Sequence, residues 1–286
     1  MAKALAKIDL DFQRYVERRK GRQQAQSREG AAYAYAGDVR FRKTLDRRPV
    51  RMALESASGL WHSDHSELRA TESTQPAVKA AIAKAAAALH VAEPAVLVVD
   101  RALPGEVGTF GSDDEPVIVI TAALVGRLLQ EELIETLGSE LGRIQNGHVL
   151  FHSAHHYLHH QAARFVRWIV APARLALDAW ALRGDVTADR AGLLCARSLV
   201  VSASSLQKRL LPIEAQTASA ESLVAALDEA ATASPAAEIL AKFPVLRRRL
   251  RALRLFAESA YYRGMLREPG GLSPTECDAK VAEVLS

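Results

Sequence analysis

The residues best placed to do chemistry surround Glu140. Ser139 precedes it directly and Arg143 follows three residues later. Because residues four apart share one face of a helix, Ser139 and Arg143 are expected to lie side by side, next to the Glu140 carboxylate. A carboxylate can act as a general base, whereas a hydroxyl is a poor metal ligand and a guanidinium is a permanent cation. This helix therefore offers a base but nothing that would hold a divalent ion.

The flanks of this site resemble the HtpX-like zinc metallopeptidase family. Residues 132–151 read ELIETLGSELGRIQNGHVLF, and the family pattern is ELxxVLGHELGHIxxGHVLY. Metallopeptidases of this type bind zinc with two His four residues apart on a helix, and the Glu beside the first His is the general base. The resemblance places that Glu at Glu140 and the two His positions at Ser139 and Arg143.

Further blocks extend the resemblance to roughly residues 35–268. Residues 180–193, WALRGDVTADRAGL, resemble WSRxAExxADRAGL, which puts Asp185 at the third zinc ligand and Asp189 at the family's Asp. Residues 243–253, FPVLRRRLRAL, resemble HPxxxxRxxAL. Residues 106–111, EVGTFG, resemble NAxTLG, the edge strand that pairs with extended substrate in the family.

The resemblance implies an α+β, predominantly helical, zincin-like metallopeptidase domain with a small β-sheet. It also implies that Glu140 is a vestigial general base, that Ser139, Arg143 and Asp185 are former metal-ligand positions, and that Asp189 lies just behind them. With both imidazoles replaced, we expect zinc to be lost and no cofactor to remain. Our hypothesis is that Arg143 replaces zinc as the cation that holds these carboxylates together, since a buried carboxylate cluster is otherwise costly.

A His-rich segment follows the site and offers an alternative set of metal ligands. His148, His152, His155 and His159 form one stripe at about 100° per residue. Position 148 is nine residues beyond Ser139, so on one continuous helix this stripe would face away from the site. A break at Gly147 would weaken that argument. The stripe could bind a transition metal, or it could be a polar face that titrates near neutral pH.

Composition limits the class of protein. The chain has 286 residues, of which 49% are hydrophobic, and a formal net charge of +4. Two cysteines, Cys195 and Cys277, give no disulfide framework and favour a reducing, cytoplasmic setting. The apolar run Phe165–Leu182 contains two Arg, a Pro and an Asp, and it falls short of a membrane span. We therefore expect a soluble protein with no membrane span and no nucleic-acid partner.

Three parts are expected along the chain. Residues 1–34 form a polar N-terminal arm, residues 35–268 the metallopeptidase-like domain, and residues 269–286 a peripheral C-terminal tail with room for one helix. Periodicity predicts helices over 75–90, 128–148, 161–183, 186–199, 202–233 (broken at Pro212) and 237–266 (interrupted near Pro244), and strands over 95–100 and 117–121. The basic stretch 247–254 is interpreted as a solvated helix face.

The leading functional expectation is a catalytically inactive metallopeptidase homologue that binds a protein or peptide partner. One alternative is an active metal-dependent hydrolase with a rebuilt site, in which Glu140 is the base and Asp185 plus unidentified His are the ligands. A third, from a different class, is a His-based metal-binding or pH-sensing module. Metal content and a peptide-cleavage assay with and without chelator distinguish these three functions.

Overall fold

The structure is a computed structural model. It describes residues 31–45, 69–71, 73–100, 103–112, 115–160 and 167–286, and the side chains at 157–160 and 167–173 are not described. Residues 1–30, which make up most of the expected N-terminal arm, therefore lie outside the described residues. Within the described part the fold is α+β and predominantly helical, with one small sheet, which confirms the coarse fold class.

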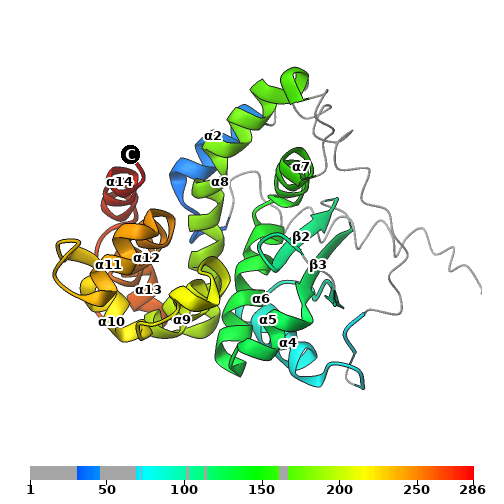
Figure 1. The fold of residues 1–286 in the computed structure, drawn as a ribbon, viewed down its shortest axis with the longest axis horizontal. Coiled ribbons are helices and arrows are strands. Elements are labelled where there is room, and N and C mark those ends of the chain that lie inside the picture. Colours follow the sequence, from blue (N-terminus) through cyan, green and yellow to red (C-terminus); the bar gives the residue numbers. More distant parts are fainter. Residues whose placement is uncertain (1–30, 46–68, 72, 101–102, 113–114, 161–166) are drawn as a thin grey trace, which may run out of the picture.

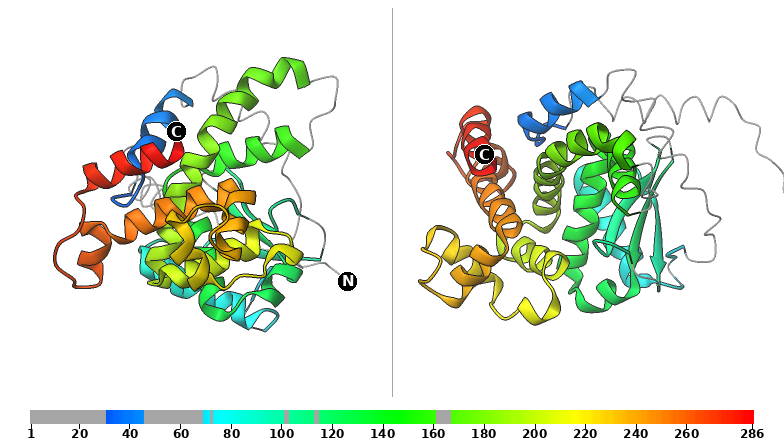
Figure 2. Two further views of the ribbon diagram at one scale, coloured as in Figure 1. Left: turned by 60° about the vertical axis from the view of Figure 1, so that its left-hand side comes forward. Right: turned by 45° about the horizontal axis from the view of Figure 1, so that its top comes forward.

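The elements follow one another in a simple order (Figure 1). They are α2 (Ala36–Leu45), α4 (Pro76–Leu89), β1 (Ala95–Val99), β2 (Val107–Gly111), β3 (Pro116–Thr121), α5 (Ala122–Arg127), α6 (Gln130–Gln145), α7 (Val149–His160), α8 (Arg167–Ala196), α9 (Leu199–Leu210), α10 (Ala220–Ala225), α11 (Pro235–Lys242), α12 (Pro244–Ala257), α13 (Ala260–Met265) and α14 (Pro274–Leu285). Short 3-10 turns span Ile213–Ala215 and Ala226–Asp228. Helix α8 runs between the sheet with α6 on one side and helices α9–α14 on the other (Figures 1 and 2).

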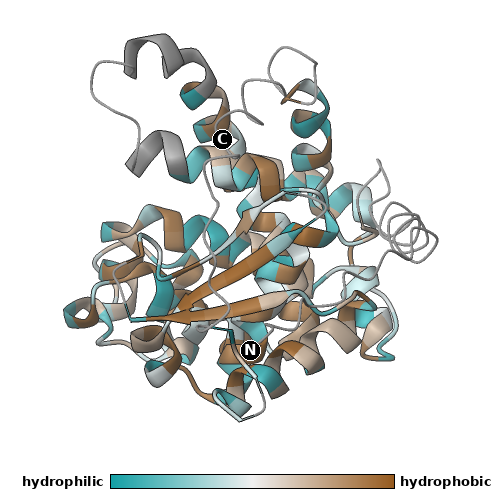
Figure 3. Ribbon diagram, turned by 90° about the vertical axis from the view of Figure 1, so that its right-hand side faces the viewer, coloured by the Kyte–Doolittle hydropathy of each residue, from teal (hydrophilic) through white to brown (hydrophobic). Residues whose placement is uncertain are grey.

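The three strands form a sheet in the order β1-β3-β2, with β1 parallel and β2 antiparallel to β3. Their side chains alternate between two cores, as a strand period of two requires. Val98 and Ile118 pack into the main core with α4 and α6, while Leu97 and Phe110 belong to a smaller cluster on the other face. Figure 3 shows the strands as the most hydrophobic part of that view. The strands predicted from periodicity are confirmed to within a residue.

Helices α6 and α8 lie unusually close because small residues face one another. A Cβ added at Gly142 would come 2.4 Å from Ala191 Cβ, and one at Gly192 would come 2.4 Å from Ser139 Oγ. These contacts exclude larger side chains and let the two backbones approach. The approach brings the acidic residues of α8 alongside α6, which positions the candidate site.

Several predicted helix boundaries are wrong. The separate helices expected at 161–183 and 186–199 are one helix, α8, which continues through Gly184 and is held on either side of it by the Trp180–Asp38 and Asp185–Arg143 contacts. The helix expected to resume after Pro212 is replaced by short helices and turns over 213–228, and 235–265 forms three helices. Helix α6 ends at Gln145, and Gly147 adopts a φ of +64 that starts a new direction for α7.

The chain ends of the described part are tied to the helical body. Tyr33 is buried and its hydroxyl donates to Gln145 Oε1 at 2.7 Å. Residues 269–286, expected to form the tail, contain α14, which packs against α12 and buries Cys277 and Val281. Arg190 of α8 also donates to Asp278 Oδ1 at 2.7 Å. Among the described helices, none combines the length and the apolar character needed to cross a bilayer.

Candidate functional site

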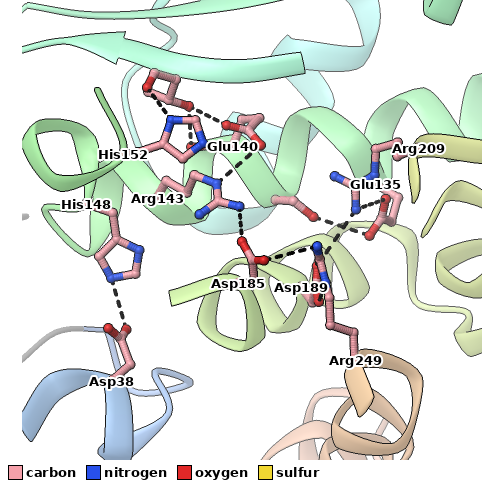
Figure 4. Close-up of polar contacts among 12 residues, drawn as sticks. Asp38, Glu135, Glu140, Arg143, His148, His152, Asp185, Asp189, Arg209 and Arg249 are labelled. Atoms are coloured by element: carbon pink, nitrogen blue, oxygen red, sulfur yellow. Dashed lines mark hydrogen bonds and ion pairs between the residues drawn. The ribbon is translucent and has the colours of Figure 1, made fainter. Parts of the chain in front are cut away.

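The guanidinium of Arg143 lies between two carboxylates from different helices (Figure 4). Its Nη2 donates to Asp185 Oδ1 of α8 at 2.6 Å, and its Nε donates to Glu140 Oε1 one turn back on α6 at 3.3 Å. The Arg143 and Glu140 side chains are buried, while a quarter of the Asp185 side chain is exposed. Glu140 and Asp185 therefore meet around the Arg143 cation.

A second arginine, Arg249 of α12, completes the network. It donates from Nε and Nη2 to both oxygens of Asp189, at 2.7 and 2.6 Å, and from Nη1 to Asp185 Oδ2 at 3.2 Å. Such a two-pronged contact is the strongest common geometry for an arginine and a carboxylate. Asp185 thus joins the two guanidiniums, and Asp189 is neutralised by Arg249 rather than by Arg143 as the hypothesis allowed.

The interpretation of 247–254 as a solvated helix face is wrong for Arg249, whereas Arg248 is exposed and Arg251 lies in an exposed ion pair. Arg249 is only 5% exposed. Arg247 donates to the backbone carbonyls of Leu227 and Glu229, while Arg251 and Arg254 pair with Asp228. Four arginines of this stretch are thus paired within the chain: Arg247, Arg249, Arg251 and Arg254.

Glu140 is held from the other side by the sheet. Thr109 of β2 is fully buried, and its hydroxyl donates to Glu140 Oε2 at 2.7 Å. Burial raises the pKa of Glu140, but the Arg143 charge and the Thr109 hydrogen bond outweigh it, so that the pKa lies below its usual value. For Asp185, burial is likewise outweighed by Arg249 and Arg143, and its pKa lies well below its usual range. Both carboxylates are therefore charged at neutral pH.

Ser139 points toward a residue that sequence reasoning did not single out. Its hydroxyl donates to Glu135 Oε1 at 3.3 Å, one turn earlier on α6, and Ser205 of α9 donates to Glu135 Oε2. Glu135 is completely buried. Burial raises its pKa, and the nearby Arg209 charge only partly offsets that effect. The Ser139 hydroxyl thus supports Glu135.

His152 returns to the site, so the expectation that the histidine stripe faces away is wrong for this residue. The cause is the turn at Gly147, which redirects α7 across β2. His152 Nδ1 lies 3.0 Å from the backbone oxygen of Thr109, and the ring lines the same cleft as Glu140 and Arg143. Burial lowers the pKa of His152 to about 4, with the Arg143 charge acting in the same direction. His152 is therefore neutral at physiological pH.

The other histidines of the stripe are dispersed. His148 is fully buried with its Nε2 2.9 Å from Asp38 Oδ2, and His155 Nε2 lies 3.0 Å from Asp178 Oδ1. His159 belongs to α7, but its side chain lies outside the described residues. In the described part of the chain, no three His, Cys, Asp or Glu side chains are grouped as metal ligands would be. The structure thus does not bring His148, His152 and His155 together as one site.

Asp38 anchors α2 to the site's supporting helices. It accepts hydrogen bonds from Trp180 Nε1 at 2.8 Å and Thr187 Oγ1 at 2.7 Å, both on α8, besides its contact with His148. Burial raises its pKa, but His148 and these hydrogen bonds outweigh it and bring the pKa to about 2.

Asp38→Asn is therefore expected to remove a pH-dependent part of the stability. A carboxyl whose pKa is lower in the folded than in the unfolded state stabilises the fold above its unfolded pKa and loses that effect as pH falls through its folded pKa. The free energy of unfolding of the wild type should exceed that of Asp38→Asn by roughly 2 kcal/mol near pH 6. This difference in free energy should shrink between about pH 4 and pH 2. Urea unfolding of both proteins across this range measures it. A difference that does not change with pH would contradict this assignment.

A cleft of about 340 Å³ opens beside the charged residues. One wall carries Glu140, Arg143, Arg209 and Arg249, and the remaining lining comes from Pro104, Gly105, Val107, His152, His155, His156 and Leu210. A volume of this size fits one side chain or a small molecule rather than a long peptide. The cleft therefore presents arginine side chains and a small apolar surface to a ligand.

The outer edge of β2 is covered by α7. The bond from Thr121 N–H to Glu106 O, together with the register Thr109↔Ile118, means that residues 107, 109 and 111 direct their backbone groups away from β3. On that side His152 Nδ1 contacts Thr109 O, and Ser153 Oγ donates to Gly111 O at 3.4 Å. Strand addition of a peptide, which we considered for this edge, would require α7 to move away.

Sequence reasoning missed several residues of this network. Thr109 and Arg249 fall on the Thr and the Arg of the quoted NAxTLG and HPxxxxRxxAL patterns, so a signal for them existed. Glu135 and Arg209 lie in ordinary helical sequence and carried no signal. Comparison of the chain with protein-family models, with curated proteins and with solved structures found no match.

Proposed function

We propose that this protein is a catalytically inactive homologue of the HtpX-like zinc metallopeptidases, with a zincin-like domain in which a guanidinium takes the place of the metal. The observation that carries the proposal is the position of Arg143, bonded at once to Glu140 and Asp185. In the family these positions correspond to the general base and the third zinc ligand.

The convergence of distant blocks supports the same proposal. Residues from 106–111, 132–151, 180–193 and 243–253 were matched to family patterns separately, and Thr109, Arg143, Asp185 and Arg249 from these blocks meet in one network. Chance resemblances scattered over the chain would have no reason to meet at one point.

The arrangement of Glu140 accounts for the absence of peptidase chemistry in this proposal. A general base is most effective with a pKa near the working pH, and hydrolysis by this class needs a metal to activate the attacking water. Here Arg143 and Thr109 each donate to one oxygen of Glu140, and its lowered pKa makes it a weaker base. The permanent charge of Arg143 also disfavours entry of a divalent cation.

The function that remains is recognition. We propose that a protein or peptide partner inserts a side chain or chain end into the cleft beside Arg143, without strand addition to β2. The setting in this proposal is cytoplasmic, in keeping with the two free cysteines, Cys195 and Cys277.

A peptide assay tests this function. Quenched fluorescent peptide pools incubated with untagged protein are expected to remain intact with and without chelator, while a subset binds in fluorescence anisotropy. Val107→Trp, which fills the cleft, should weaken that binding by at least roughly tenfold, whereas Val245→Trp at an exposed position should not. Chelator-sensitive cleavage would reject the proposal in favour of a hydrolase, and binding unaffected by Val107→Trp would remove the cleft from the function.

A further inference from the structure

Arg209 is the arginine of the cleft whose donors remain unused. It projects from α9, and its side chain is only 6% exposed. Its nearest acidic oxygens are Glu135 Oε2 at 3.7 Å and Asp189 Oδ1 at 3.8 Å, both beyond hydrogen-bond distance. Nε and Nη2 are closed to solvent and have no hydrogen-bond partner among the described residues. A guanidinium carries five N–H donors, and leaving them unpaired in a buried position is costly.

The neighbouring carboxylates are already engaged by other donors. Both oxygens of Glu135 accept hydrogen bonds from serines, Ser139 and Ser205, and both oxygens of Asp189 accept from Arg249. Figure 4 shows Arg209 beside Glu135, with Asp189 and Arg249 next to it. The network thus attracts Arg209 by charge without hydrogen-bonding it.

We propose that the cleft is a carboxylate-binding site in which Arg209 is the principal donor. In the recognition function proposed above, on which this extension rests, the carboxylate would belong to the partner's chain end or to an acidic side chain. The planar fork of a guanidinium matches a carboxylate in two-point contact, which at Arg209 requires the ligand to displace the atoms that cover Nε and Nη2. Val107, Leu210 and Pro104 supply an apolar surface for the body of the ligand.

Charge favours a monoanion over a dianion. The network contains three guanidiniums, from Arg143, Arg209 and Arg249, and the carboxyl groups of Glu135, Glu140, Asp185 and Asp189. Burial raises the pKa of Glu135, which shifts it toward its neutral form and brings the cluster closer to charge balance. One added negative charge at Arg209 is then tolerated better than the two charges of a phosphate.

The test uses N-acetyl-leucine as the probe and N-acetyl-leucinamide as its neutral match. By calorimetry or NMR titration, the wild type should bind the acid at least roughly tenfold more tightly than the amide, because a hydrogen bond to a charged group is worth that much. Arg209→Gln should lose a similar factor, Arg209→Lys should fall in between, and Arg251→Gln, at an exposed pair with Asp228, should match the wild type. Circular dichroism checks that each variant is folded.

Several results would overturn the carboxylate site. They are no binding of the acid to the wild type, equal binding of acid and amide, unchanged binding by folded Arg209→Gln, or tighter binding of inorganic phosphate than of the acid. The acid–amide comparison uses only wild-type protein, so it decides the matter even if Arg209→Gln does not fold. Loss of this site while peptides still bind in a manner sensitive to Val107→Trp would reject the extension alone. Acid binding without any peptide binding would reject the recognition function instead.

Discussion

Replacing Arg143 by Met is expected to lower the free energy of unfolding by about 3–5 kcal/mol, the cost typical of removing one partner from a buried ion pair. Met preserves much of the side-chain length and is a good helix former, so the change removes mainly the charge and its hydrogen bonds. Glu140 would keep only Thr109 as a partner, whereas Asp185 would keep Arg249. The uncompensated charge would therefore fall mostly on Glu140.

That asymmetry gives the experiment its controls. Glu140→Gln should restore more stability to Arg143→Met than Asp185→Asn does, because it neutralises the carboxylate with fewer remaining partners. Arg251→Met makes the same substitution in an exposed pair with Asp228. It should lower the free energy of unfolding by under about 1 kcal/mol. Urea unfolding measures all of these. An Arg143→Met protein as stable as the wild type would show that Arg143 does not hold the carboxylates together.

Local sequence patterns were sufficient for the coarse architecture. Short apolar runs rich in β-branched residues located β1 and β3, and the apolar stripe of 76–89 located α4. These features depend on neighbours in the chain, so a single sequence contains them. The same holds for the Glu140 helix, which periodicity located apart from its C-terminal end.

Features that depend on tertiary packing were not predictable in this way. Gly184 lies inside α8, whose residues on either side are held by distant segments, Trp180 by Asp38 and Asp185 by Arg143. The turn at Gly147 reversed the expected direction of His152, since one residue with positive φ redirects the whole of α7. Such outcomes are decided by contacts between segments that are far apart in the sequence.

Prediction of the site was partial for the same reason. Glu140, Arg143 and Asp185, singled out from the sequence, contact one another, and Asp189 joins them through Arg249. The place of Arg209 in the site could be identified only from its distances to Glu135 and Asp189 in the structure. A basic helix gives no indication of which arginine will be buried, because that depends on how the helix rotates against its neighbours.

Building three metal ligands around Glu140 tests whether Arg143 occupies the place of a metal ion. If Arg143 stands where a metallopeptidase would hold zinc, then Ser139→His, Arg143→His and Asp185→Glu combined should recreate the three ligands beside Glu140. In the Ser139→His substitution the new imidazole must turn away from Glu135, to which the serine hydroxyl now donates. It must instead face the carboxylate introduced by Asp185→Glu. Loss of the Arg143 charge would also leave the carboxylates in need of a cation, which zinc supplies.

The measurement is zinc content after dialysis against excess zinc and removal of free metal, with untagged wild type and triple variant treated in parallel. The account predicts about one zinc per chain in the triple variant, raised thermal stability on zinc binding, and no retained zinc in the wild type. A folded triple variant that retains no zinc would contradict the account. So would wild-type protein that holds one zinc per chain and cleaves peptides in a chelator-sensitive manner.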